Sequence, residues 1–148
     1  MNESNSEALA QFEQGFYCAE SVLLALAKHQ GIESELLPKI ATGLCSGMAR
    51  TGGMCGALSG GILGVSLASG RSTTEETVEI NYQMVRELID SFVAKFGSTN
   101  CSELLECRLD SVEGQEEFKE KELWNRCRDC SETAERLALG IISKIEIE

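Results

Sequence analysis

The sequence is poor in residues on which many enzymes and structured scaffolds depend. Its 148 residues include one proline, one histidine and only 5% aromatic residues. The single histidine, His29, lies in a Lys-His-Gln stretch typical of an exposed helix end, and no motif for Ser-His-Asp or Cys-His catalysis surrounds it. A Walker loop and a dinucleotide-binding glycine signature are also missing. These absences argue against the common hydrolase and nucleotide-binding classes.

Positive charge is scarce as well. The chain has 13 Lys and Arg residues against 24 Asp and Glu residues, giving a formal net charge of -11. Nucleic acids and anionic membrane surfaces would repel such a chain, so neither is expected as a partner. The first residues, MNESNSEALAQ, lack the apolar segment of a secretory signal. We therefore expect a cytoplasmic protein.

Cysteine, in contrast, is abundant, with seven residues. A chain of this length can bury a sufficient core without disulfides, and an odd number of thiols cannot pair fully within one chain. In a reducing compartment, such a composition favours metal binding or redox chemistry over covalent stapling. Packing as small buried hydrophobic residues would explain two or three of these cysteines.

Apolar residues recur every three or four positions, which is the period of amphipathic helices. Residues 6–28 are expected to form one helix, or two helices with a break near 15–17, where Gly15 interrupts the pattern. Other stripes predict helices over 36–48 and 78–96, a short helix near Cys101 and a last helix over about 130–145. The whole chain, residues 1–148, is therefore predicted to be an all-α single domain of five or six helices.

Two details accompany this prediction. The capping boxes Ser72-x-x-Glu75 and Thr73-x-x-Glu76 are expected to open the helix of residues 78–96, and Gly97 is expected to end it. Tyr82, Trp124 and the phenylalanines are interpreted as core or packing residues.

Residues 51–70 carry no charge, and half of them are glycine or serine. The length suits a membrane span, but the composition and the lack of aromatic anchors favour a central buried helix. Its small residues are spaced by four, at Gly52, Gly56, Gly60, Gly64 and Ala68. Such a ridge allows a neighbouring backbone to approach closely, either within the chain or across a homodimer.

Four thiols fall at expected helix starts, namely Cys18, Cys55, Cys101 and Cys130. A helix N-terminus carries about +0.5 of an elementary charge and unpaired N–H donors, which lower a thiol pKa and stabilise a thiolate. Converging helix starts would therefore offset the negative charge of four thiolates around a metal centre.

The three remaining cysteines are weaker candidates. Cys45 lies on an apolar stripe and is expected to pack in the core. Cys107 follows Cys101 by six residues, so a continuous helix would turn its side chain away from the face that carries Cys101. Cys127 forms a C-x-x-C pair with Cys130, which leaves it open as a ligand, a resolving thiol or an incidental residue.

The motifs resemble those of the C_GCAxxG_C_C family of small redox-active proteins. The resemblance extends over Gly15-Phe16-Tyr17-Cys18-Ala19-Glu20-Ser21-Val22-Leu23, Cys55-Gly56-Ala57-Leu58-Ser59-Gly60, Phe96-Gly97-Ser98-Thr99-Asn100-Cys101 and Cys130. It covers nearly the whole chain, although Tyr17 stands where asparagine is frequent. Cys130 aligns better than Cys127 as the last cysteine.

The resemblance implies a redox role, an iron–sulfur cluster and an origin in anaerobic microbes. The chain is also similar to the non-haem domain of split-Soret cytochromes, to which an iron–sulfur centre is attributed.

The leading hypothesis is an electron-transfer protein that serves a redox partner protein rather than acting as a catalyst. Cys18, Cys55, Cys101 and Cys130 would bind a [2Fe–2S] or [4Fe–4S] cluster. Three alternatives stay open: a thiol–disulfide redox protein using Cys127 and Cys130, a structural zinc site with four cysteine ligands, and an interaction module whose cysteines only pack.

Overall fold

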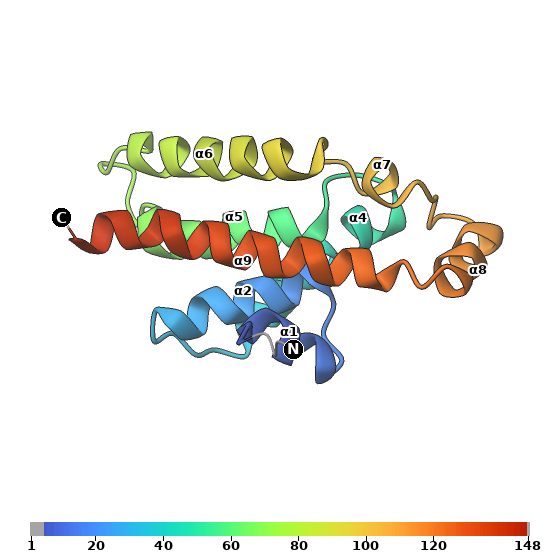
Figure 1. The fold of residues 1–148 in the computed structure, drawn as a ribbon. Helices are drawn as coiled ribbons and strands as arrows, with labels where there is room; N and C mark the ends of the chain where they lie inside the picture. Colours follow the sequence, from blue (N-terminus) through green and yellow to red (C-terminus); the bar gives the residue numbers. More distant parts are fainter. Residues whose placement is uncertain (1–4, 148) are drawn as a thin grey trace.

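The computed structural model describes residues 5–147, with side chains to Ile145. Residues 1–4 and 148, which belong to the predicted 1–148 domain, lie outside the described residues. Four long helices run side by side: α2 (Cys18–His29), α5 (Gly56–Ser69), α6 (Glu79–Phe96) and α9 (Trp124–Ile147) (Figure 1). Helix α5 packs against the other three, so the predicted all-α class and its central glycine-rich helix are confirmed.

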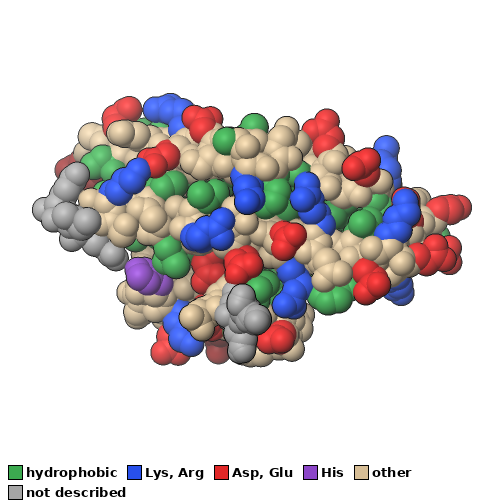
Figure 2. Space-filling model, in the orientation of Figure 1, with side chains coloured by type: hydrophobic (Ala, Val, Ile, Leu, Met, Phe, Trp, Pro, Cys, Tyr) green, Lys and Arg blue, Asp and Glu red, His purple; other side chains and the backbone are tan. Residues whose placement is uncertain are grey.

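The core lies between these long helices and is mostly aliphatic. Its largest fully buried side chains include Leu23 and Leu26 of α2, Leu58 of α5, and Leu88 and Phe92 of α6. Around it, acidic, basic and apolar side chains are interspersed on the face drawn in Figure 2. In the described part of the chain, no helix combines the length and hydropathy that a bilayer crossing requires.

Five shorter helical segments complete the described chain: α1 (Glu7–Glu13), α3 (Leu36–Thr42), α4 (Cys45–Arg50), α7 (Cys101–Leu105) and α8 (Val112–Glu120). The number of segments therefore exceeds the predicted five or six, because breaks divide several apolar stripes. Helices α1 and α3 pack against α2. Helices α4, α7 and α8 gather at one end of the bundle, on the right in Figure 1.

The break near Gly15 separates α1 from α2, in line with the second of the two alternatives. Gly15 has a φ of 109°, a conformation that suits glycine. Helix α1 is also fastened to α9, since the carboxylate of Glu135 accepts hydrogen bonds from Ser6 Oγ and the backbone N–H of Ala8. The chain can therefore reverse direction before Cys18 while α1 keeps its hydrogen bonds to α9.

The glycine ridge of α5 is filled from within the chain. A Cβ atom on Gly60 would lie 2.5 Å from the carbonyl oxygen of Ala19, and one on Gly64 would overlap the side chain of Leu26. The ridge on which the homodimer prediction rested is thus covered by α2, and the homodimer itself stays a prediction. Gly52 does not belong to the helical ridge, because it precedes α5 and has a φ of 79°.

Several predicted boundaries are wrong. Helix α6 begins at Glu79, and Glu76 instead accepts hydrogen bonds from the N–H groups of Ser72 and Thr73 in the exposed turn before it. Gly97 ends α6 with a φ of 87°, as predicted. Tyr82 and Trp124, interpreted as core residues, are 52% and 43% exposed. Helix α9 starts at Trp124 rather than near Cys130.

Candidate functional site

A cavity of about 310 Å³ lies at the end of the bundle where the short helices gather. Five thiols line it, those of Cys18, Cys55, Cys101, Cys127 and Cys130. Cys127 is half-buried and the other four are buried, and all seven cysteines of the chain are free thiols. The volume corresponds to about ten water molecules at roughly 30 Å³ each, which is room for a small molecule or an inorganic cluster.

Cys55 and Cys101 are held side by side by a short antiparallel contact. Met54 and Asn100 form an isolated β-bridge. The N–H of Cys55 donates to the carbonyl of Thr99 at 2.7 Å, and the N–H of Cys101 donates to the carbonyl of Gly53 at 2.7 Å. Backbone hydrogen bonds therefore fix the relative position of two thiols that are far apart in the sequence.

Each of these two thiols also begins a helix, as predicted. Cys55 is the N-cap of α5, and Cys101 is the first residue of α7. Asn100 caps α7 by accepting a hydrogen bond from the N–H of Glu103 at 3.2 Å. The Asn-x-x-Glu pattern of the sequence thus identified this helix start.

Cys18 is the first residue of α2, also as predicted. The N–H of Tyr17 donates to Glu20 at 3.0 Å, so the carboxylate of Glu20 takes part in capping the helix where the Tyr17 side chain does not. The sulfur of Cys18 lies against Gly56, where any Cβ atom would overlap it. Gly56 therefore allows this thiol to reach the start of α5.

Cys127 and Cys130 come from the first two turns of α9, three residues apart and on one helix face. The prediction that Cys130 opens the last helix is wrong, since six residues of α9 precede it. The Asp129-x-x-Glu132 pattern is a capping signature that lies inside a helix. The apolar stripe that includes Cys130, Ala134 and Ala138 extends back to Cys127. This periodicity indicates that the last helix begins before Cys127, in agreement with its start at Trp124.

Burial and contacts between neighbouring thiols raise the pKa of three cavity cysteines, Cys55, Cys101 and Cys127. Contact with the Cys130 thiol, followed by burial, raises the pKa of Cys55, and the N–H groups of Ala57 and Leu58 lower it by less. Burial raises the pKa of Cys101 to about 11 and that of Cys127 to about 12, with further contributions from neighbouring thiols. The expected lowering by helix starts is therefore outweighed at Cys55 and Cys101, and both thiols are protonated at neutral pH without a bound metal.

The two remaining thiols do not line the cavity. The Cys45 thiol donates to the carbonyl of Ala41 at 3.7 Å, and its pKa is raised, first by a hydrogen bond to Cys18 and then by burial. The Cys107 thiol donates to the carbonyl of Gly114 at 3.1 Å, and its pKa is raised mainly by burial. Cys45 is buried, as expected for a packing residue, and Cys107 is buried beyond the end of α7 at Leu105 rather than on a continuous helix.

One wall of the cavity has a backbone that the sequence did not predict. In α4, residues 46–50 all have positive φ angles between 58° and 70°, which is a left-handed turn. A left-handed conformation costs roughly 1–2 kcal/mol per non-glycine residue. Gly47 is the only glycine of the five, and a Cβ atom there would lie 2.5 Å from the Cβ of Cys101. The turn thus brings backbone close to a cavity thiol.

The donor chemistry of the cavity is uniform. Of the residue types that commonly bind metals, Cys, His, Asp and Glu, only cysteine occurs among the described residues that line the cavity. Thiolates suit iron–sulfur clusters and zinc, so the donor set fits either group. Within residues 5–147, however, no three Cys, His, Asp or Glu side chains are arranged around a single metal ion.

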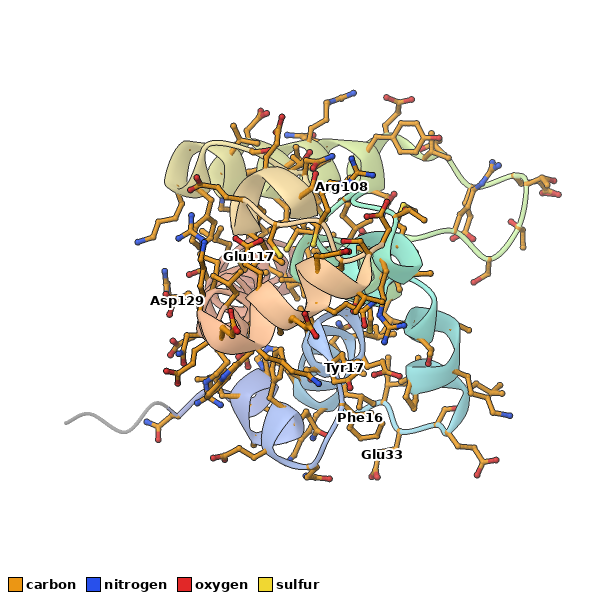
Figure 3. All side chains as sticks on the ribbon, turned by 90° about the vertical axis from the view of Figure 1, so that its right-hand side faces the viewer. Phe16, Tyr17, Glu33, Arg108, Glu117 and Asp129 are labelled. Carbon is orange, nitrogen blue, oxygen red and sulfur yellow. The ribbon has the colours of Figure 1, made fainter. Side chains whose placement is uncertain are left out.

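Figure 3 looks onto this end of the bundle, with Tyr17 and Phe16 from the α1–α2 connection below and Arg108 from the segment after α7 above. A family model described as Putative redox-active protein (C_GCAxxG_C_C) matches residues 16–141. The chain therefore belongs to this redox-active family. Neither a curated protein nor a solved structure matches the chain.

Proposed function

We propose that the protein transfers electrons through an iron–sulfur cluster bound by Cys18, Cys55, Cys101 and Cys130. The observation that carries the proposal is the cavity shared by these four thiols, which come from α2, the start of α5, α7 and α9. Their spacing in the sequence is unlike the compact cysteine runs of bacterial ferredoxins, so the tertiary fold would assemble the site. Membership of a redox-active family supports the same role.

A bound cluster would accept and release single electrons, with a potential set by its type, its hydrogen bonds and its exposure. The chain's own contribution begins with proton release, because the raised pKa values of Cys55 and Cys101 keep these thiols protonated until a metal displaces the protons. The N–H groups of Ala57 and Leu58 act on the Cys55 sulfur and favour its thiolate. Four fixed elements would then hold the sulfurs in place.

Cys130 is the proposed fourth ligand because it is only 1% exposed and its thiol contacts that of Cys55. Cys127 lines the same cavity from one turn earlier in α9, so it lies close enough to compete. With a net charge of -11, the protein is expected to meet a redox partner protein through a basic face of that partner. A cytoplasmic location is part of this proposal.

The test is purification without oxygen, followed by measurement of iron, acid-labile sulfide and zinc per chain. We expect brown protein with iron and sulfide in comparable amounts, and an electron paramagnetic resonance signal after reduction. Cys55→Ser should abolish both the iron and the signal, whereas Cys107→Ala, which removes a buried thiol that lies outside the cavity and donates to the carbonyl of Gly114, should retain them. Retained iron in Cys55→Ser would contradict the ligand assignment.

The fourth ligand is assigned by comparing two single variants. Cys130→Ser should lose the cluster, and Cys127→Ser should keep it with a normal spectrum. The opposite result would transfer the role to Cys127.

The alternatives give different outcomes. One equivalent of zinc in colourless protein would identify a structural metal site. Reversible formation of a Cys127–Cys130 disulfide in metal-free protein would identify thiol–disulfide chemistry. That second outcome requires the backbone of α9 to distort, since Cβ atoms three residues apart in a helix are separated by about 5–6 Å, against about 3.8 Å in a disulfide.

A further inference from the structure

The lining of the thiol cavity has a charge opposite to that of the whole chain. Of its described lining residues, Arg50, Lys119 and Arg126 are cationic and none is acidic. The whole chain, in contrast, has 24 acidic residues against 13 Lys and Arg residues. A cavity wall that excludes carboxylates in such an acidic protein has a local charge suited to an anion.

The three cations come from separate elements. Arg50 ends the left-handed turn of α4, Lys119 lies in the last turn of α8, and Arg126 lies in the first turn of α9. Arg126 is held in place, because its Nε donates to the carbonyl of Leu104 and its guanidinium lies 5.2 Å from the ring centroid of Phe96. Arg50 and Lys119 are exposed and form no ion pair with the described residues.

The same cavity has aromatic and aliphatic walls. Trp124 and Tyr17 line it and are exposed, while Phe118, Leu104 and Leu105 line it from more buried positions. Arg128 stacks over the Trp124 ring, at 5.4 Å from its centroid. Apolar walls with a few placed polar groups are the usual composition of a small-molecule site, and 310 Å³ lies at the lower end of the volumes of such sites.

We propose that this cavity binds a small organic anion whose apolar body lies on Trp124 and the leucines and whose anionic group faces Arg50 and Lys119. The anionic group is a carboxylate or a phosphate, and both share this recognition. Five thiols line the same cavity, four of them buried, so a bound anion would lie close to any cluster held there. The role of the ligand therefore rests on the proposed function, although its binding does not.

The test uses two probes of nearly equal shape, 4-phenylbutanoate and the uncharged 4-phenylbutan-1-ol. Trp124 is the only tryptophan in the chain and lines the cavity, so its fluorescence reports binding directly. Metal-free, reduced full-length protein is titrated with each probe, and calorimetry provides a second readout. We expect saturable binding of the carboxylate, weaker binding of the alcohol, and a loss of this difference at high salt.

Charge-removing variants locate the anion. Arg50→Gln and Lys119→Gln should each weaken 4-phenylbutanoate binding about two- to fivefold, the range expected for exposed charge pairs, and leave binding of the alcohol unchanged. Lys39→Gln removes an exposed charge of the same sign from α3, away from the cavity, and should leave both affinities unchanged. Phenyl phosphate, titrated in the same way, compares a phosphate with the carboxylate.

Equal affinity for the acid and the alcohol, or no saturable binding of either, would overturn the proposal. So would unchanged binding in the Arg50→Gln/Lys119→Gln double variant. These outcomes are independent of the cluster, because iron content after anaerobic purification is measured on the same variants. Normal iron content without anion binding would contradict only the proposed anion site. Anion binding without iron would contradict only the proposed cluster.

Discussion

The two ends of the molecule are built by different rules. The bundle formed by α2, α5, α6 and α9 consists of long right-handed helices in close contact, with an aliphatic core. The thiol end consists of short segments, an isolated β-bridge and a left-handed turn, and it surrounds a cavity. Apolar side chains fill the first region, whereas the second leaves a cavity that five thiols line.

This contrast shows where the chain can tolerate unfavourable local structure. Burial of apolar surface contributes about 25 cal/mol per Å², and the long helices supply most of it. The left-handed turn of residues 46–50 is energetically unfavourable to keep, because four of its five residues are not glycine. The bundle therefore provides the stability that allows the thiol end to hold a strained arrangement.

The largest expected effect comes from closing the contact between α2 and α5. In Gly60→Ala, the added Cβ would lie 2.5 Å from the carbonyl oxygen of Ala19, and that backbone atom cannot move away without separating the helices. We expect a loss of about 3 kcal/mol in the free energy of unfolding, measured by denaturant titration.

Gly140→Ala in α9 is the matched control, since its Cβ would meet no atom within 4 Å. This variant should gain about 0.5–1 kcal/mol through the higher helix propensity of alanine. Equal effects of the two substitutions would show that close packing along the glycine ridge does not matter.

The buried Cys101 thiol should make stability depend on pH above 9. The pKa of Cys101 is raised from its ordinary value of 9.0 to about 11, so the thiol is protonated in both folded and unfolded chains below pH 9. Above pH 9 the unfolded chain loses this proton first, so stability falls as pH rises through 11. A shift of two pKa units corresponds to about 2.7 kcal/mol.

Metal-free, reduced protein should therefore lose stability in urea titrations between pH 9.0 and about 11. Cys101→Ser should flatten part of this dependence. A wild-type profile that is flat over this range would contradict the proposed burial of the thiol.

The left-handed turn gives the smallest effect and the clearest change of sign. Ala49 is exposed with a φ of 58°, so Ala49→Gly should stabilise the protein by about 1 kcal/mol. Ala94 is exposed in the right-handed helix α6, and Ala94→Gly should destabilise by about 0.5–1 kcal/mol. Thermal unfolding of both variants checks the signs, and destabilisation by both would argue against the turn.

The sequence predicted the bundle better than the thiol end. Helical periodicity, the break at Gly15 and the stop at Gly97 depend on local chemistry, and the structure agrees with each. The starts of α2, α5 and α7 beside Cys18, Cys55 and Cys101 were also readable from glycine and capping patterns.

What the sequence could not provide depends on contacts between distant segments. The left-handed turn contains a single glycine, Gly47, and Thr51 supports it through hydrogen bonds to the carbonyls of Gly47 and Met48. The cationic wall comes from three separate elements, so no motif marks it. The capping signature at Asp129 was misleading because its residues also fit the interior of a helix.

The cavity draws its thiols from segments between Cys18 and Cys130, which has a consequence for biosynthesis. The first sulfur emerges from the ribosome long before the last, and the pocket can close only when α9 is available to pack. A cysteine motif confined to a few neighbouring residues can capture its metal while translation continues. Here, the separated thiols come together only when synthesis is nearly complete, so loading of the proposed cluster would be a late, post-translational step.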